Sequence, residues 1–462
     1  APTAFIASNQ LPASGVIYVT GAGAPDAIYS SLQAAIDAAS AGDVIHVGAG
    51  TYNEDLVINK AVTIEGANHG VSGTGTRGAE TILTGQSQIT TTGQVIIDGV
   101  EFLDNKPFDS QTASSSDRFV SLSIYANSTA GDVVENSKFV RAPSSDTAGN
   151  YLSGSNQPMH LGIELASVGA GQTLTIANNL FTGANPNSYA GDDWRSGIWS
   201  NGGAGTTNIN NNTFTNARTG INADNFDSNV HISGNSFNSD GTGVALAGSS
   251  VSPVASITGN TFNNVDAAFN IKNVLTPVSF DVGGTNNSAT GKPLYVELGG
   301  GGDITGTSGA DVLQSDAGTV VFHHTAGGDA LIGSSTAVDT ATGYSASATL
   351  AYSGGHWTVT DNGSTDTLYG VDKVVIGGQT YDLDQFGADD GGFQTIQDAV
   401  NHASAGDIIE IAAGTYSENV VVSTNNLTLV GQGDATIIKG TFKSDNGIAD
   451  GGVQAFLTAG NA

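Results

Sequence analysis

The sequence predicts an all-β fold dominated by a right-handed parallel β-helix, with a short N-terminal capping helix, a small β linker module and the start of a second β-helix. Three observations predict it: a short repeat with apolar and Asn columns, a long repeat that restarts the opening pattern of the chain, and a composition poor in helix formers. Glycine accounts for 64 of 462 residues. This much Gly disfavours helical bundles, and a hydrophobic share of 39% argues against a disordered chain.

The charge balance excludes several classes of partner. Lys and Arg total 13 and Asp and Glu total 43, so the net charge is −30. Such a chain lacks the basic surface that nucleic acids or anionic membranes require, and no stretch approaches the ~18 apolar residues of a membrane span. There is no Cys, which fits export from a bacterium, so we expect an extracellular or bacterial cell-surface protein. Because residue 1 is Ala, we expect the chain to begin after processing or within a longer polypeptide.

A long repeat links the two ends of the chain at a constant spacing of 364 residues. Residues 31–54 have the sequence SLQAAIDAASAGDVIHVGAGTYNE, and residues 395–418 have the sequence TIQDAVNHASAGDIIEIAAGTYSE. In each copy, apolar residues at i, i+3, i+4 and i+7 predict a short amphipathic helix, which Gly42 or Gly406 ends. The strands predicted to follow are Val44–Val47, Leu56–Ile58 and Val62–Ile64 in the first copy, and Ile408–Ile411, Val420–Val422 and Leu427–Val430 in the second.

A shorter repeat, I-x-x-N-x-F, defines the coils of the predicted β-helix. A coil of this kind buries its Ile and Phe only if neighbouring coils stack on it, and its Asn can hydrogen-bond to copies ~4.8 Å above and below. The spacing of the later copies, 33, 23 and 25 residues, fits one coil with occasional insertions. We predict such inserted loops at 103–118 and 142–160. The four copies are Ile176/Asn179/Phe181, Ile209/Asn212/Phe214, Ile232/Asn235/Phe237 and Ile257/Asn260/Phe262.

The opening segment and the N-x-F coils together resemble secreted right-handed parallel β-helix proteins of the pectate-lyase-like superfamily. The resemblance covers residues 25–295 and 393–462. That superfamily includes polysaccharide-active enzymes as well as bacterial surface proteins and adhesins. The resemblance therefore implies a fold and leaves the two classes of function open.

The segment between the two β-helices has a different pattern. Residues 299–319 and 326–345 resemble the glycine–aspartate nonapeptides of repeats-in-toxin proteins, in which Gly-rich turns gather oxygen ligands around calcium. An alternative is that these are turn-forming Asp residues beside Gly, a common pairing. The resemblance implies calcium as a cofactor and makes its candidate ligands Asp303, Asp311, Asp329 and Asp339.

Further along this segment, short apolar runs predict a β-meander. The runs are Thr349–Tyr352, His356–Thr360, Thr367–Leu368 and Lys373–Ile376. The chain therefore divides into three predicted domains: a β-helix over 1–295, a repeats-in-toxin-like linker module over 296–392, and the cap and first coils of a second β-helix over 393–462.

Aligning the coils on a strand that begins Gly-Ile predicts columns of side chains. Side chains of successive coils lie ~4.8 Å apart on one sheet face, so residues at equal offsets from this Gly share a column. These columns and a nearby loop acid contain the candidate site residues His160, Arg195, Arg218, Trp199, Asn201, Asp224 and Asp193.

These residue types suit a saccharide groove. Trp199 would stack on a sugar ring, Arg195 and Arg218 would hold a carboxylate or hydroxyls, and Asn201 would add a polar contact. Proton abstraction beside a uronate would need a base, either His160 or Arg218, and charge neutralisation by an acid-bound cation. A glycosidase would need paired carboxylates ~5–9.5 Å apart, for which Asp193 and Asp224 are the candidates. Alternatively, the two arginines only pair with surplus acids on an exposed sheet.

Two functional hypotheses follow. The first is an extracellular structural protein, such as an adhesin, a surface-layer protein or a filament subunit, that assembles with other copies or with adjoining modules of a longer chain. This hypothesis rests on the prediction that a second β-helix starts at 393; because the sequence stops at 462, its strand edges would be left unpaired. The alternative is a polysaccharide lyase, C5-epimerase or glycoside hydrolase acting on an acidic glycan.

Overall fold

The structure is a computed structural model in which the chain forms two compact units. Unit 1 comprises Ala1–Leu275 and Thr285–Leu294, and unit 2 comprises Thr276–Gly284 and Tyr295–Ala462. Parallel strand pairing dominates both units, which confirms the predicted all-β, parallel β-helix class. The division into three domains stays a prediction. The residues described are 17–20, 27–105, 118–125, 131–142, 159–166, 168–183, 196–201, 205–224, 230–247, 257–272, 278–284, 286–353, 356–383, 395–403, 408–411, 414–422, 427–431, 436–439 and 442–444.

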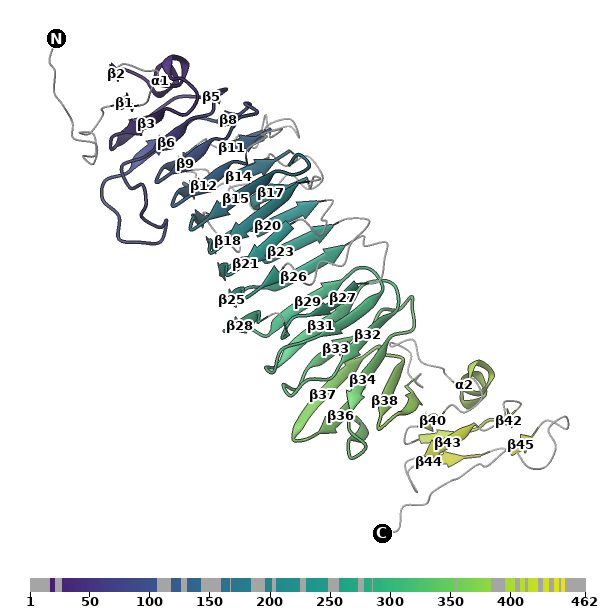
Figure 1. Cartoon of the computed structure of the whole chain (residues 1–462). Helices are drawn as coiled ribbons and strands as arrows, with labels where there is room; N and C mark the ends of the chain where they lie inside the picture. The colour runs from purple at the N-terminus through teal and green to yellow at the C-terminus, as the bar shows by residue number, and fades with distance from the viewer. Residues whose placement is uncertain are drawn as a thin grey trace, which may run out of the picture. The chain divides into compact units, whose positions relative to one another are not determined.

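Each coil of unit 1 contributes one strand to each of three parallel sheets, and Figure 1 shows the strands of successive coils following one another. The first sheet contains β1 (Ile17–Thr20), β2 (Ala27–Tyr29), β3 (Val44–Val47), β6 (Thr63–Glu65), β9 (Ile96–Asp98), β12 (Val133–Glu135), β15 (Thr173–Ala177), β18 (Thr206–Asn210), β21 (Val230–Ser233) and β24 (Ile257–Thr258). The second contains β4 (Gly50–Tyr52), β7 (Thr81–Leu83), β10 (Glu101–Asp104), β13 (Lys138–Arg141), β16 (Leu180–Thr182), β19 (Thr213–Thr215), β22 (Ser236–Asn238), β25 (Thr261–Asn263) and β28 (Ser288–Thr290). The third contains, within unit 1, β5 (Leu56–Ile58), β8 (Ser87–Ile89), β11 (Arg118–Ile124), β14 (Met159–Leu165), β17 (Ser196–Ser200), β20 (Thr219–Asp224), β23 (Thr242–Ala247) and β26 (Ala267–Lys272).

Stacked aromatic rings fill the core of unit 1. Neighbouring rings of the Phe column have centroids 4.7–5.0 Å apart and planes within 11° of parallel. Glycines at the start of the third-sheet strands make room for these rings, since a Cβ on Gly220 would lie 2.6 Å from the Phe237 ring. The repeated Gly that aligned the coils therefore has a packing cause. The column consists of Phe102, Phe139, Phe181, Phe214, Phe237 and Phe262.

A ladder of buried Asn side chains joins the coils, as the repeat predicts. In each rung, the backbone N–H and the Nδ2 of one Asn donate to the Oδ1 of the Asn in the next coil, at 2.9–3.1 Å. The same Nδ2 also donates to a backbone carbonyl of the preceding coil, at 2.8–3.0 Å. The ladder satisfies backbone groups that would otherwise be buried without partners. Its members are Asn179, Asn212, Asn235, Asn260 and Asn287.

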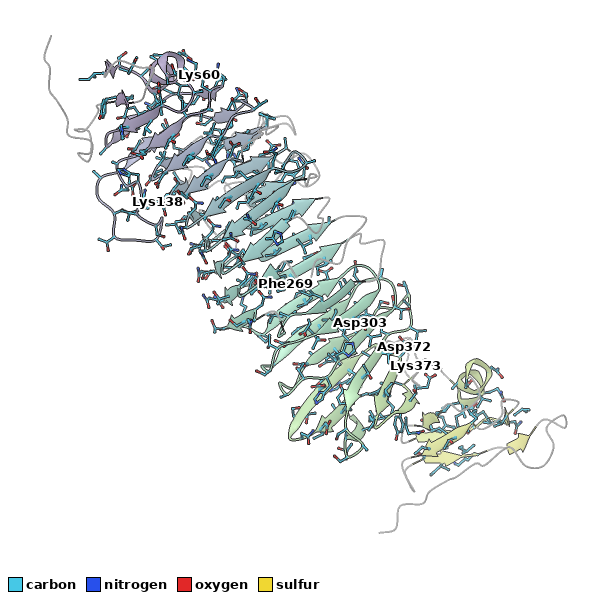
Figure 2. All side chains as sticks on the ribbon, viewed as in Figure 1. Lys60, Lys138, Phe269, Asp303, Asp372 and Lys373 are labelled. Carbon is cyan, nitrogen blue, oxygen red and sulfur yellow. The ribbon has the colours of Figure 1, made fainter. Side chains whose placement is uncertain are left out.

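The N-terminal edge of unit 1 is closed by β1, which pairs antiparallel with β3, and by helix α1 (Leu32–Ala38). Ser31 caps the helix by accepting the Ala34 N–H, and the two oxygens of Glu54 accept the N–H groups of Leu32 and Gln33, at 2.9 and 3.0 Å. The Gln33 side chain bonds to the backbone N–H and C=O of Val57 in β5, which occupies the edge of that strand. The helix ends at Ala38, before the predicted Gly42. Figure 2 places Lys60 beside this helix, where its ammonium donates to the Ala39 carbonyl at 2.7 Å.

Unit 2 also consists mainly of parallel strands. One sheet contains β27 (Val278–Asp281), β30 (Gly302–Thr305), β32 (Val320–His323), β34 (Thr340–Tyr344), β38 (Lys373–Ile376), β39 (Gln379–Asp382), β40 (Ile408–Ile411) and β43 (Thr428–Gly431). The other contains β29 (Leu294–Leu298), β31 (Asp311–Ser315), β33 (Ala330–Ile332), β37 (Ser364–Tyr369), β36 (His356–Asp361) and β35 (Thr349–Ser353). The predicted meander holds for β35, β36 and β37, which pair antiparallel. Its predicted fourth strand, β38, instead pairs parallel with β34 in the other sheet.

The long repeat reproduces the cap inside unit 2. Glu418 accepts two N–H groups at the start of helix α2 (Ile396–His402), and the Gln397 side chain bonds to Val421 as its counterpart bonds to Val57. Two further strand pairs follow: β41 (Gly414–Tyr416) with β44 (Thr436–Ile438), and β42 (Val420–Val422) with β45 (Phe442–Ser444). The apolar pattern of the sequence did not predict β4 and β41, the strands that the two AGTY motifs form. Within the described residues, neither helix has the length and apolar character that a membrane span requires.

Candidate functional site

The outer face of the third sheet in unit 1 carries the predicted columns. Strand register aligns Glu164, Trp199, Asn222, Ala245 and Asn270 on successive coils, in that order. The next outward column begins with Tyr125, Ala166 and Asn201, whose N–H groups each donate to the preceding coil. Equivalent positions of neighbouring coils lie ~4.8 Å apart, so both columns run across the strands.

Exposure distinguishes the residues of this face. Trp199, Asn201 and Asn222 are half-buried, and Arg218, just before β20, is exposed. Tyr125 is 51% exposed, which makes it a second aromatic side chain on the face, two coils from Trp199. Glu164 is buried at 6% although it occupies an outward position. The face therefore offers aromatic surface, amides and a guanidinium within a few coils.

Several predicted residues cannot be placed on this face. Arg195 and Asp193 lie outside the described residues. Asp224 ends β20, in register with Ala247, but its side chain is outside the description. The proposed Asp193–Asp224 carboxylate pair is therefore untested, as is the pairing of the two arginines.

His160 differs from the expectation of an open column with the arginines. Its side chain is only 7% exposed, and its Nδ1 lies 2.7 Å from Oδ2 of Asp104. The other oxygen of Asp104 accepts from Nη1 of Arg141 at 2.9 Å, and both of these side chains are 0% exposed. The reason is the register of the second sheet, which sets Asp104 opposite Arg141 at the C-terminal ends of β10 and β13. The three residues form a buried ionic cluster at these strand ends.

Sequence reasoning missed Asp104, Arg141 and Tyr125. A signal for the first two was present: each stands two residues after a core Phe, in F-L-D and F-V-R, so opposite charges share one column. The corresponding residues of the following coils are Gly183 and Asn216, two positions after Phe181 and Phe214. Because residues two apart in a strand face the same side of the sheet, these charges face the core beside the Phe column, and the pair could have been predicted as a buried contact. Tyr125 follows β11 directly and had no equivalent aromatic residue in other coils to identify it.

The predicted calcium ligands lie in a side-chain-to-backbone ladder of unit 2. Oδ1 of Asp329 accepts the Asp311 N–H at 2.9 Å, and Oδ1 of Asp339 accepts the Val320 N–H at 2.7 Å. Asp303 lies apart from them and pairs with His323 at 3.1 Å. Across the described residues, no three His, Asp or Glu side chains converge closely enough to hold a metal ion. Calcium binding stays a prediction.

Burial raises the pKa of these acids. For Asp311, Asp329 and Asp339 the cause is desolvation, which hydrogen bonds from neighbouring backbone and hydroxyl groups offset only in part. The pKa of Asp329 rises to about 6, with the nearby Asp366 carboxylate adding to the rise. The Asp329 carboxyl group therefore changes its charge at a higher pH than an exposed Asp does.

Comparisons with known proteins add the following. No protein-family model matches the chain, and no curated protein sequence matches it. Among solved structures, the chain is similar to the alginate lyase AlyF-OU02, with 13% identity and a TM-score of 0.34 over 89% of this chain and 81% of that one. It is also similar to AlyGC, an alginate lyase of the PL6 family, with 14% identity and a TM-score of 0.24 over 89% of this chain and 70% of that one. Because the identities and scores are this low, these similarities carry no argument about the site or the activity of this chain.

Proposed function

We propose that unit 1 binds an acidic polysaccharide on the outer face of its third sheet and cleaves it as a lyase. The observation that carries this proposal is the strand register that sets the half-buried Trp199 next to Asn222, with the exposed Arg218 at the start of the same coil as Asn222. An indole offers a flat apolar surface to a sugar ring, and a guanidinium binds a carboxylate through two parallel hydrogen bonds.

The negative charge of the chain makes a local cation such as Arg218 necessary for binding an acidic polymer. A chain of net charge −30 repels an acidic polymer at long range, so local cations must offset that repulsion where the polymer binds. Arg218 is exposed, and it lies on the face that also carries the aromatic side chains Trp199 and Tyr125. The proposed substrate is therefore a uronate polymer, whose carboxylate supplies the partner for the guanidinium.

A lyase step requires fewer groups beyond those on this face than a hydrolase step does. A base removes the proton from the carbon next to the uronate carboxylate, the C4–O4 bond breaks, a C4–C5 double bond forms, and the leaving oxygen takes up a proton. The step needs a base and a cation that stabilises the charge developing on the carboxylate. A hydrolase would instead need a pair of carboxylates across the scissile bond, for which Asp193 and Asp224, whose side chains lie outside the description, are the candidates.

The test is incubation with alginate, polygalacturonate and hyaluronan, followed by analysis of the products. Unsaturated uronate ends identify a lyase, new reducing ends without unsaturation a hydrolase, and inversion at C5 without chain cleavage an epimerase. Arg218→Ala should abolish the unsaturated product. Lys138→Ala, which removes a cation from the second sheet, is the matched control and should leave it unchanged. Absence of any product from every polymer, with intact folding, would contradict the proposal.

The duplicated cap favours a second candidate function, a modular extracellular surface protein that associates with other copies of itself. The same Glu and Gln contacts form in both copies of the long repeat, an arrangement suited to tandem modules. Sedimentation velocity over a wide concentration range, with electron microscopy, tests it. Concentration-dependent end-to-end assembly is expected, and a particle that stays monomeric throughout would remove this candidate.

A further inference from the structure

We propose that Asp104 and Arg141 are positioning residues that hold His160 as the proton-abstracting base of the lyase step. The inference rests on the proposed lyase function and assigns a role to the buried cluster that the sequence did not reveal. Asp104 and Arg141 would act through His160 and would not touch the polymer themselves.

The hydrogen bond from His160 to Asp104 selects one tautomer of the imidazole. A carboxylate oxygen only accepts hydrogen bonds, so the Nδ1 that lies 2.7 Å from Oδ2 of Asp104 must carry the proton. The lone pair of a neutral ring is then on Nε2, which bonds to nothing within the described part of the chain. A fixed tautomer with an available Nε2 is the state that a general base requires.

Arg141 balances the charge that would otherwise accompany this arrangement. Asp104 alone, at 0% exposure, would be a buried carboxylate without a counter-charge. The Arg141 guanidinium, 2.9 Å from the other oxygen, already neutralises the carboxylate. His160 therefore does not have to supply the counter-charge of Asp104, and the carboxylate serves to orient the imidazole ring.

Strand register connects the cluster to the proposed binding face. Leu161, the residue after His160, pairs with Ser196, and Glu164 of the same strand pairs with Trp199. The offset between β17 and β20 then aligns Ser196 with Thr219, the residue after Arg218. His160 and Arg218 thus precede aligned positions two coils apart, ~9.6 Å along the stack. In the proposal, a polymer that lies along the stack contacts the Arg218 guanidinium and the His160 ring two coils apart.

The tautomer can be measured in the full chain without any substrate. Selective ¹⁵N labelling of the eight histidines, with His160 assigned by His160→Gln, reports which ring nitrogen carries the proton. At pH 7.5 the proposal predicts a neutral His160 ring protonated at Nδ1. A ring protonated at Nε2, or one doubly protonated, would overturn it.

Kinetics tests whether this geometry serves the reaction. His160→Gln should lower kcat by about 10²–10⁴-fold with little change in KM, because general-base catalysis contributes on that scale. The charge-neutral double variant Asp104→Asn/Arg141→Gln should retain His160 yet lower kcat by about tenfold or more, because the tautomer is no longer fixed. Asp104→Asn alone leaves a buried guanidinium unbalanced, so the double variant guards against misfolding.

The outcomes separate this inference from the proposed function. If the wild type forms unsaturated product and both variants keep the wild-type kcat, the inference fails and the lyase proposal stands. If His160 shows the Nδ1–H tautomer but no uronate polymer yields product, the lyase proposal fails and His160 has only a structural role. Loss of kcat in both variants, with an unchanged KM, supports the inference.

Discussion

The two units connect their coils with the same kind of hydrogen bond but with different side chains. In unit 1 an Asn side chain accepts the N–H of its copy in the preceding coil, as Asn235 does for Asn212 at 2.9 Å. In unit 2 an Asp does this, as Asp329 does for Asp311 at 2.9 Å and Asp366 for Asp329 at 2.8 Å. Both ladders are buried and supply an acceptor to backbone groups that the sheets leave unpaired.

The difference between amide and carboxylate determines how each unit responds to pH. An amide is neutral, and its Nδ2 bonds to a carbonyl on the other side of the rung. A buried carboxylate lacks that donor and is costly to ionise, so burial raises the pKa of Asp329 and of Asp372 to about 6. In unit 1, Asp240 is a comparable acid: its Oδ1 accepts the Ala217 N–H at 2.7 Å, and burial raises its pKa to about 8. The comparison predicts a pH-insensitive ladder in unit 1 and a titratable one in unit 2.

Removing one rung should give the largest effect. Asn235→Ala leaves the N–H and Nδ2 of Asn212 and the Ile209 carbonyl without their bonds to residue 235. Since each buried polar group left unpaired costs about 1–3 kcal/mol, the free energy of unfolding of unit 1 should fall by about 3 kcal/mol or more. Chemical denaturation measures this. Thr215→Ala, at a half-buried outward position of the second sheet, is the control and should cost less than about 1 kcal/mol. Equal losses in the two variants would contradict the ladder.

Exchanging amide and carboxylate should transfer the pH dependence from one unit to the other. The folded-state pKa of Asp329 lies above its ordinary 3.8. Its contribution to the stability of unit 2 is therefore complete below pH 3.8 and is lost as the pH rises through about 6. Asp329→Asn should therefore stabilise unit 2 above pH 7, by about 3 kcal/mol for a shift of this size. Conversely, Asn235→Asp should make unit 1 lose stability as pH rises, and Asp240→Asn should stabilise unit 1 above pH 8.

Thermal unfolding from pH 4 to pH 9 measures these changes. A stability profile of Asp329→Asn that parallels the wild type would mean that the Asp ladder does not titrate in the folded chain. Adding calcium or a chelator in the same series tests the predicted ion: a melting temperature that neither reagent moves counts against calcium at Asp303, Asp311, Asp329 or Asp339.

The two caps offer a smaller and more symmetric comparison. Glu54→Ala and Glu418→Ala each remove the acceptor for two N–H groups at the start of a helix. Losing a cap of this kind costs about 0.5–2 kcal/mol. Hydrogen exchange at α1 or α2 should rise only in the unit that carries the substitution. A rise in both units would contradict two independent caps.

Whether a feature could be predicted from the sequence depends on whether it repeats along the chain. The Asn ladder, the Phe stack and both caps repeat along the sequence, so one copy identifies the others. Strand β4 was not predicted because Gly50 and Thr51 show no apolar alternation. The strand forms by pairing with β7. The contact between Asp104 and His160 joins residues 56 positions apart across an insertion, and no periodic signal encodes it. Repetition thus predicted the scaffold, whereas the single-copy residues of the site required the structure.

The claim that unit 1 carries the polysaccharide-binding face is tested most directly by two matched tyrosines. Tyr125 in unit 1 is 51% exposed and Tyr369 in unit 2 is 44% exposed, so each offers similar aromatic surface. In calorimetric titration with uronate oligosaccharides, Tyr125→Ala should weaken binding by about 2–10-fold, the effect of losing about 0.5–1.5 kcal/mol of stacking, and Tyr369→Ala should leave it unchanged. Equal weakening by both substitutions, or weakening by Tyr369→Ala alone, would contradict the assignment of the site to unit 1.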